Sequence, residues 1–114
     1  MNDCLFCKFV SGEFAVNKVF EIDDFIIIRD INPQAVNHFL AIPKNHYKLL
    51  AEMTEDDSRV LGRILKTIPT LEELLCLKKG YRLVVNQGDD AGQTVPHLHI
   101  HILSGQTMGW NPAG

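Results

Sequence analysis

The chain has 114 residues, 46% of them hydrophobic, and a net charge of −3, which predicts one globular domain over residues 1–114. It has no block of basic residues, so the sequence predicts no general binding of nucleic acid. No apolar run reaches the ~20 residues of a membrane span and no secretory leader is evident, so we expect a cytoplasmic protein that does not bind membranes.

The first half of the chain predicts a short helical segment and three strands. Phe9 and its apolar neighbours open the sequence as a helical turn. Residues 18–21 predict the first strand, and the β-branched run over residues 25–30 predicts a buried second strand. Residues 38–42 predict the third strand, which ends at a proline.

The second half begins with one long helix. Thr54 and Asp57 form a box-like N-terminus, and the helix is expected to end before Gly80. Pro69 lies inside this span, and we expect it to kink or break the helix. Cys76 is expected in the core. The buried stripe is predicted from apolar residues at helical spacing: Val60, Leu61, Ile64, Leu65, Ile68, Leu71, Leu74 and Leu75.

Two further strands complete the predicted fold. Residues 81–86 and residues 95–103 predict strands that the polar loop over residues 88–92 joins as an antiparallel hairpin. The fold class is therefore α+β, with a five-stranded antiparallel sheet and one long helix on one face.

The last predicted strand contains the most informative pattern in the chain. Residues 97–103 read His-Leu-His-Ile-His-Ile-Leu, and this alternation places His97, His99 and His101 on one face of a strand. Imidazole titrates near neutral pH and acts as a base, a nucleophile or a ligand. The middle ring, with an imidazole on each side, is the best nucleophile by geometry. The pattern predicts a catalytic or binding surface.

Two kinds of chemistry fit this surface. A neutral imidazole can attack phosphorus and form a covalent intermediate that water then cleaves. The residues just before the histidines, 92–94, read Gly-Gln-Thr and offer hydrogen-bond donors that suit phosphate oxygens. Alternatively, the histidines can ligate zinc, which would make a hydrolase that works through metal-bound water.

The histidine run resembles the motif of the histidine triad (HIT) family, His-φ-His-φ-His-φ-φ with φ apolar. Further segments agree with that family over nearly the whole chain, namely residues 30–35, 38–46, 80–86 and 92–95. The ending over residues 108–114 is similar to the Hint branch, the histidine-triad nucleotide-binding proteins. The Fhit-like branch of dinucleoside polyphosphate hydrolases does not usually share such an ending.

The resemblance implies a purine nucleoside phosphoramidase, which cleaves the P–N bond of adenosine or guanosine 5′-phosphoramidates and releases the nucleoside monophosphate without a required cofactor. His99 matches the nucleophile, and His101 matches the residue that contacts the scissile phosphate. His97 and His38 match histidines that complete the cluster, and Thr94 stands near the leaving group. The alternatives are a Fhit-like dinucleoside polyphosphate hydrolase and a nucleotide-binding or scaffold protein.

The resemblance also implies which residues bind the nucleotide. Asp30 matches the acid that binds the ribose hydroxyls, a role that suits a carboxylate because it accepts two hydrogen bonds. Asn86 and Gln93 match contacts on the phosphate side. The other matches are Ile31, the base-pocket residues Phe6, Phe9, Phe14, Ile28 and Leu40, and Trp110 near the chain end.

Two assembly features follow from the resemblance as well. The family forms a homodimer in which two five-stranded sheets become one sheet of ten strands, and its C-terminal tail reaches toward the partner's site. Trp110, the one tryptophan, is reasonable interface material.

A pair of cysteines near the start, Cys4 and Cys7, resembles one found in many bacterial members, where two cysteines and two histidines hold a structural zinc. Such a pair is a good half-site for tetrahedral zinc, and His46 and His97 are the candidates for the other half. The alternative is two unligated thiols. A closed site of four ligands leaves no position for water, so zinc there would not make this a zinc hydrolase.

Overall fold

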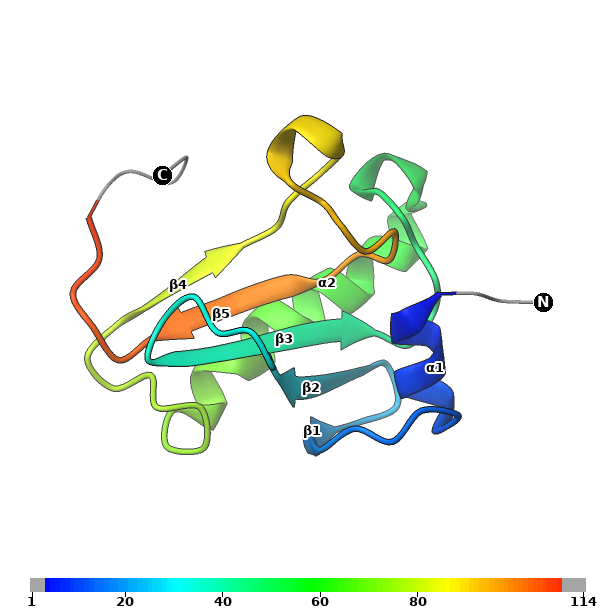
Figure 1. Ribbon diagram of the computed structural model, residues 1–114. Coiled ribbons are helices and arrows are strands. Elements are labelled where there is room, and N and C mark those ends of the chain that lie inside the picture. The colour runs from blue at the N-terminus through cyan, green and yellow to red at the C-terminus, as the bar shows by residue number, and fades with distance from the viewer. Residues whose placement is uncertain (1–3, 110–114) are drawn as a thin grey trace.

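A computed structural model describes residues 4–109 and shows an α+β fold, as the sequence predicts. Five strands form one antiparallel sheet in the order β1-β2-β3-β5-β4. The strands are β1 (Lys18–Glu21), β2 (Phe25–Arg29), β3 (Asn37–Pro43), β4 (Tyr81–Val84) and β5 (Ile100–Ser104). The central position of β3 and β5, which is visible in Figure 1, places the histidine segment beside the middle of the sheet.

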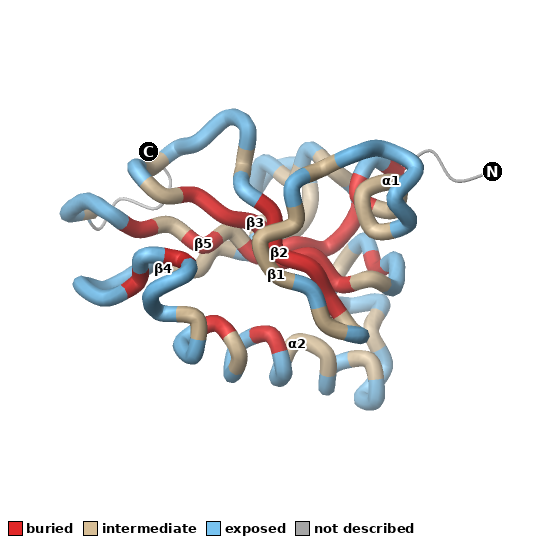
Figure 2. Tube along the Cα trace, turned by 90° about the horizontal axis from the view of Figure 1, so that it is seen from below, coloured by how far each residue is buried: buried red, intermediate tan, exposed pale blue. Residues whose placement is uncertain are grey.

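Helices cover both faces of this sheet. The helix α2 (Glu55–Thr67) runs along one face, and the shorter helix α1 (Leu5–Ser11) covers part of the other face (Figure 2). Three short 3-10 helices lie in the connections: η1 (Leu50–Glu52), η2 (Ile68–Leu71) and η3 (Asp89–Ala91). Among the helices of the described residues, none combines the length and the apolar composition needed to cross a membrane.

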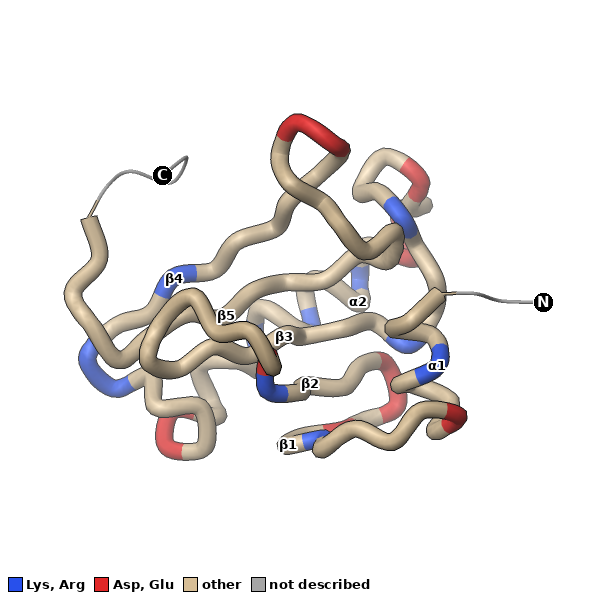
Figure 3. The backbone as a smooth tube through the Cα atoms, in the orientation of Figure 1, with Lys and Arg blue, Asp and Glu red and all other residues tan. Residues whose placement is uncertain are grey.

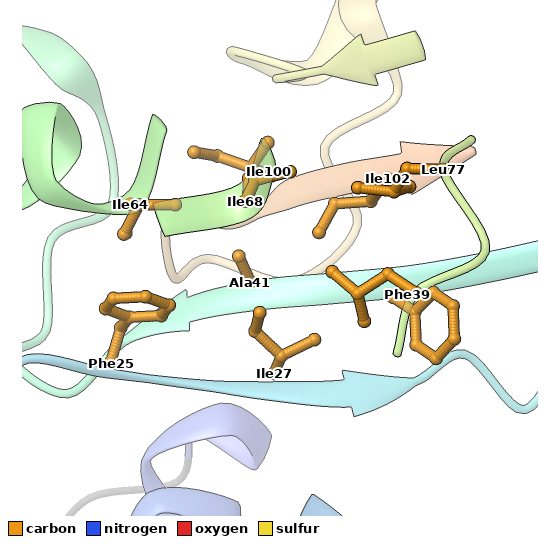
Figure 4. Close-up of a cluster of buried hydrophobic side chains, with 10 residues drawn as sticks. Phe25, Ile27, Phe39, Ala41, Ile64, Ile68, Leu77, Ile100 and Ile102 are labelled. Atoms are coloured by element: carbon orange, nitrogen blue, oxygen red, sulfur yellow. The ribbon is translucent and has the colours of Figure 1, made fainter. Parts of the chain in front are cut away.

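The main core lies between α2 and the sheet. Ile64 and Ile68 approach the strands from the helical side, where they meet Ala41, Ile100 and Ile102 (Figure 4). These side chains are at most 1% exposed. Because full burial of an isoleucine contributes about 1.5–3 kcal/mol, this layer is a main source of stability.

A smaller core lies on the opposite face, beneath α1. It contains Phe6 from the helix, Ile26 and Ile28 from β2, and Leu40 and Ile42 from β3. Both faces of β2 are covered, one by each core, which explains why consecutive residues of this strand are apolar. On the neighbouring strand β3, the residues that share this face with Leu40 include His38.

The N-terminus of α2 confirms the predicted capping box. The Thr54 hydroxyl accepts the Asp57 N–H at 3.1 Å, and the Asp57 carboxylate accepts the Thr54 N–H at 3.0 Å. The predicted break at Pro69 is confirmed too, because the α-helix stops at Thr67 and continues as η2. Proline has no N–H with which to continue the α-helical hydrogen bonds.

The predicted continuation of the helix toward Gly80 is wrong, and so is part of the predicted stripe. Leu65 and Leu74 are 49% and 48% exposed. Cys76, which was expected in the core, is exposed and has a φ of +60°, the left-handed conformation that ends helical turns. Leu75, which precedes this turn, is buried instead.

The last two strands are antiparallel, as predicted, but the connection between them is longer than a hairpin loop. It spans residues 85–99, so β5 begins only at Ile100. His97 and His99 thus precede the strand in which they were predicted. A tight turn in which the His97 N–H donates to the Val95 carbonyl at 2.8 Å bends this segment. Pro96, inside that turn, cannot donate a strand hydrogen bond.

Candidate active site

A cavity of about 460 Å³ lies on the α1 face of the sheet. Apolar side chains form most of its wall, and a few polar groups converge at one end, which is typical of a small-molecule site. The predicted site residues that line it are Phe6, Phe9, Ile28, Asp30, Ile31, His38, Leu40, Thr94, His99 and His101.

Other predicted residues lie outside the lining of this cavity. Phe14 is 46% exposed, and the Lys8 ammonium lies 4.8 Å from its ring centre. The Gln93 side chain accepts a hydrogen bond from the Gly88 N–H at 2.8 Å and donates one to the Lys48 carbonyl at 2.7 Å, so it joins two loops.

Two more predictions remain without support from the cavity. Asn86 is half-buried on the segment after β4, where its carbonyl accepts a hydrogen bond from the Gln87 side chain. The prediction for Trp110 falls outside the described residues.

Only one ring nitrogen of His99, Nε2, is left available for a reaction. Its Nδ1 lies 2.8 Å from the His97 carbonyl oxygen, which can only accept, so Nδ1 carries the proton. Burial lowers the pKa of His99, although the hydrogen bond to His97 and the charge of Asp30 oppose the shift, and the neutral ring therefore has its lone pair on Nε2. That is the form in which an imidazole acts as a nucleophile.

The neighbours of the His99 ring differ from the expected two imidazoles. Phe6 meets the ring edge-on at 5.0 Å on one side, and His101 meets it at 4.9 Å. His97, which was predicted on the same strip, is fully buried and its ring packs against His46 instead. The physical reason is the turn before β5, which interrupts the strand alternation that the prediction assumed.

His38 and His101 form a chain of directed hydrogen bonds. The main-chain N–H of Gln34 donates to His38 Nδ1 at 2.9 Å, so the proton of neutral His38 must lie on Nε2. That Nε2 lies 2.9 Å from His101 Nδ1, which therefore accepts, and the proton of His101 lies on its own Nε2. Within the described part of the chain, His101 Nε2 is buried without a hydrogen-bond partner. The chain of bonds thus ends in a donor beside the cavity.

The electrostatics of the site keep these rings neutral at pH 7. Burial is the main reason that the pKa of His101 falls to about 4, and the neighbouring His99 and His38 rings lower it further. Burial also lowers the pKa of His38, while the charge of Asp30 opposes the shift. The strands β3 and β5 carry no Lys, Arg, Asp or Glu (Figure 3), so the charges that line the cavity come from Arg29 and Asp30 at the end of β2.

The Asp30 carboxylate is held at the rim of the cavity. One of its oxygens accepts the Asn32 N–H at 2.8 Å, and the other lies 3.4 Å from His38 Nε2. The main chain of Asp30 is fixed as well, because its N–H donates to the His38 carbonyl at 2.9 Å. The acid therefore keeps acceptor positions for a ligand.

A second cluster lies directly behind His99. The ligand atoms of Cys4, Cys7, His46 and His97 all lie within 4.8 Å of one another. His97 Nδ1 is 3.3 Å from the Cys4 sulfur and 3.5 Å from the Cys7 sulfur, while His46 Nδ1 is 3.2 Å from the Cys7 sulfur. We call these four residues the Cys/His cluster.

The Cys/His cluster fits a tetrahedral zinc ion. Two thiols and two imidazoles are a common donor set for structural zinc. The His97 Nε2 donates to the Pro43 carbonyl at 2.8 Å, which leaves Nδ1 free to face the sulfurs, and zinc ligands usually have such a carbonyl partner. Burial lowers the pKa of His97 to about 4, so its ring is neutral, as a ligand must be.

Sequence reasoning missed some of this site. The Gln34 N–H, which sets the proton positions of two histidines, is a main-chain group that residue identity does not reveal. Val16 and Val95 also line the cavity, but an isolated valine gives no signal of a ligand. A larger cavity of about 720 Å³ lies beside the start of β4 and is lined by Lys78, Lys79 and other residues, none of them histidine.

Comparison with known proteins places this geometry in context. Residues 11–108 match the model of the HIT domain. An uncharacterized HIT-like protein from Synechococcus elongatus is 40% identical over 110 residues, which are 96% of this chain and 96% of that protein.

Solved structures agree with the sequence match. The crystal structure of a HIT family hydrolase from Legionella pneumophila is 42% identical with a TM-score of 0.87, and the alignment covers 97% of this chain and 100% of that one. The histidine triad nucleotide-binding protein from Candida albicans is 32% identical with a TM-score of 0.79, over 95% of this chain and 82% of that one.

Proposed function

This chain belongs to the HIT domain family, and from that premise we propose that it is a purine nucleoside phosphoramidase that works through a nucleotidyl-histidine intermediate. One observation carries the proposal. The His99 ring, with its lone pair on Nε2, packs 4.9 Å from the ring of His101, which carries a buried N–H donor, and both line one cavity with the Asp30 carboxylate. Nucleophile, proton donor and ribose acceptor are the three groups that such a reaction needs.

The first step forms a covalent bond to phosphorus. His99 Nε2 attacks the phosphorus of the 5′-phosphoramidate, and the P–N bond to the amine breaks with its electron pair on the amine nitrogen. His101 Nε2 gives its proton to that nitrogen, and the hydrogen bond from His38 Nε2 to His101 Nδ1, 2.9 Å long, stabilises the negative charge left on the His101 ring. The amine leaves and a nucleotidyl-His99 remains.

The second step reverses the roles. Water attacks phosphorus, the bond to His99 Nε2 breaks with its electron pair on the ring nitrogen, and a proton from water returns to the His38–His101 pair. The products are a nucleoside monophosphate and a free amine. Thr94, which lines the cavity, would donate to the departing group, and Asp30 would accept from the ribose hydroxyls.

The Cys/His cluster supports a structural zinc in the same proposal. Zinc would fix the start of α1 against the segment that contains His97, and a site of four protein ligands leaves no position for reactive water. Metal analysis of the purified protein should find about one zinc per chain. Cys7→Ser should lose it, while Cys76→Ser, at an exposed position away from the cluster, should retain it.

The metal-hydrolase alternative has one feature in its favour, since Asp30, His38 and His101 also bring their ligand atoms within 4.8 Å. The 2.9 Å between His38 Nε2 and His101 Nδ1 is a hydrogen-bond distance. Two nitrogens bound to one tetrahedral zinc lie about 3.3 Å apart. The geometry therefore favours the imidazole mechanism, and removal of any metal ion not held by the Cys/His cluster should leave the chemical step intact.

A homodimer completes the proposal. β4 is an edge strand of the sheet, and Tyr81 at its start is 39% exposed. Pairing of β4 with the same strand of a second copy would cover this edge and produce the ten-stranded sheet. Light scattering should then give twice the mass of one chain, and a monomer at all concentrations would refute the dimer alone.

Mass spectrometry tests the proposed reaction. After rapid mixing with an adenosine 5′-phosphoramidate and acid-free quenching, the protein should gain about 329 Da, mapped to His99. His99→Ala should bind AMP and form no adduct. Turnover without any adduct in the wild type, or full turnover in the variant, would favour direct attack by water, whereas AMP binding with neither turnover nor adduct would favour the scaffold alternative.

A further inference from the structure

The helix α1 is short, yet its side chains form part of the wall of the cavity. With seven residues it is too short to be stable alone, because isolated helices under about 12 residues are marginal in water. Yet Leu5, Phe6 and Phe9 supply one wall of the nucleotide cavity. The order of that wall therefore depends on what holds α1 in place.

The Cys/His cluster is the attachment at the start of this helix. Cys4 is the N-cap residue, and its sulfur accepts the Cys7 N–H at 3.5 Å. Both thiols lie within 3.5 Å of a ring nitrogen of His97 or His46, residues that lie far away in the sequence. A cation bound among these four side chains would fasten α1 to the segment before β5.

Two contacts connect the Cys/His cluster to His99. Phe6 lies between the two cysteines in sequence, is 4% exposed, and meets both His97 at 5.9 Å and His99 at 5.0 Å edge-on. The carbonyl of His97, a buried member of the cluster, accepts the Nδ1–H of His99 at 2.8 Å. One contact fixes the plane of the His99 ring, and the other fixes which nitrogen carries the proton.

We propose that a soft divalent cation such as Zn²⁺, bound by the Cys/His cluster, acts as a positive effector of nucleotide binding and that Phe6 is the positioning residue that transmits its effect to His99. This inference rests on the proposed function, since it takes His99 as the nucleophile. The cation orders α1, α1 holds Phe6 against the His99 ring, and Nε2 then faces the cavity. Without the cation, α1 frays and both contacts to His99 loosen.

Thermodynamic linkage gives a quantitative test. We expect Zn²⁺-loaded protein, freed of excess metal, to bind AMP about fivefold or more tightly than metal-free protein in calorimetry. By reciprocity AMP must tighten Zn²⁺ binding by the same factor. Phe6→Leu should still bind Zn²⁺ but lose this coupling. Phe9→Leu is the matched control on the same helix and cavity wall, and it should weaken AMP binding while it keeps the coupling factor.

A second measurement needs neither nucleotide nor turnover. In protein labelled with ¹⁵N at histidine, the ring-nitrogen shifts of His99 should report one tautomer, protonated at Nδ1, when Zn²⁺ is bound. They should report a mixture of tautomers in metal-free protein and in Zn²⁺-loaded Phe6→Leu. The kcat of Phe6→Leu should fall more than its KM rises, because a misdirected nucleophile affects the chemical step.

These results separate the inference from the proposed function. Identical His99 spectra with and without Zn²⁺, or equal AMP affinity in the two states, would overturn the inference alone. Failure of the wild type to bind Zn²⁺ would overturn both the inference and the proposed structural zinc, but not the proposed reaction. An absent His99 adduct would overturn the proposed function, and the spectra of the nucleotide-free protein would still decide whether the Cys/His cluster controls the ring.

Discussion

The two faces of the sheet divide the work of this molecule. On the α2 face, Ile64 and Ile68 pack against strand residues that are all apolar and fully buried. On the α1 face, a short helix leaves room for a cavity, and the same strands present His38 and His101. Strand alternation produces the difference, since every second residue of β3 and β5 faces each way. The α2 face therefore provides most of the buried apolar core, and the α1 face provides the candidate active site.

The largest expected effect comes from the nucleophile. We predict that His99→Ala lowers kcat for an adenosine phosphoramidate by at least about 10⁴-fold, because the covalent route is lost. The thermal midpoint should change little, since this ring packs on the α1 face and outside the main core. Activity within tenfold of the wild type would contradict the assignment.

Next in size is the proton donor. His101→Gln removes the buried Nε2–H that no described group satisfies, and we expect kcat to fall by about 10²–10⁴-fold. The loss should be smallest for substrates whose leaving group needs no proton, such as a nucleotide ester of an acidic phenol, which leaves as phenoxide. An equal loss for both kinds of substrate would show that His101 does not protonate the leaving group.

A substitution in the core of the α2 face should change the stability of the protein and leave its activity unchanged. Ile64→Ala leaves a cavity against Ile100 and Ile102, and we expect the free energy of unfolding in urea to fall by about 2–5 kcal/mol. Below the unfolding transition kcat should stay near the wild-type value. A large loss of kcat in folded protein would break the division between the faces.

Acid should lower the free energy of unfolding through the buried histidines of the α1 face. His38 and His101 have a lowered pKa in the folded protein, to about 4 for His101, because burial disfavours the charged ring. The unfolded chain, with a pKa near 6.5, binds more protons between these values, so the free energy of unfolding falls as the pH drops from 6.5 toward 4. Urea titrations at several pH values should show this slope, and it should be shallower in His101→Gln. An unchanged slope in that variant would assign the effect to other groups.

The smallest effect concerns the start of α2. Thr54→Ala removes the hydroxyl that accepts the Asp57 N–H, and we expect a loss of about 1 kcal/mol of stability without a change in kcat. Thr54→Ser, which keeps the hydroxyl, is the control. A loss as large in the serine variant would point to the methyl group instead of the cap.

Elements that depend on local sequence signals were predicted well, and those that depend on tertiary packing were not. Local signals sufficed for β2, where a continuous β-branched run occurs, and for the start of α2, where Thr54 and Asp57 cap the helix. Cys76 was misplaced because the end of a helix after a proline depends on tertiary packing, here the burial of Leu75 and Leu77 on both sides of it. Propensity does not encode that competition.

The candidate site shows a similar limit. The identity and spacing of the histidines indicated a reactive surface, and the cysteine pair made His97 a candidate zinc ligand. The strand alternation nevertheless placed His97 beside His99 on one strip, whereas His97 faces Cys4 and His99 lines the cavity. That separation arises from a turn before β5, and the proton positions arise from main-chain groups of His97 and Gln34. Such groups are the same in every residue, so no sequence pattern reports them.

The stereochemical course at phosphorus tests the covalent route most directly. A substrate made chiral at phosphorus with sulfur and an oxygen isotope undergoes two in-line displacements if His99 first bonds to phosphorus and water then displaces it. We predict net retention of configuration in the nucleoside product. Net inversion would mean a single direct attack by water and would contradict the role of His99 as nucleophile.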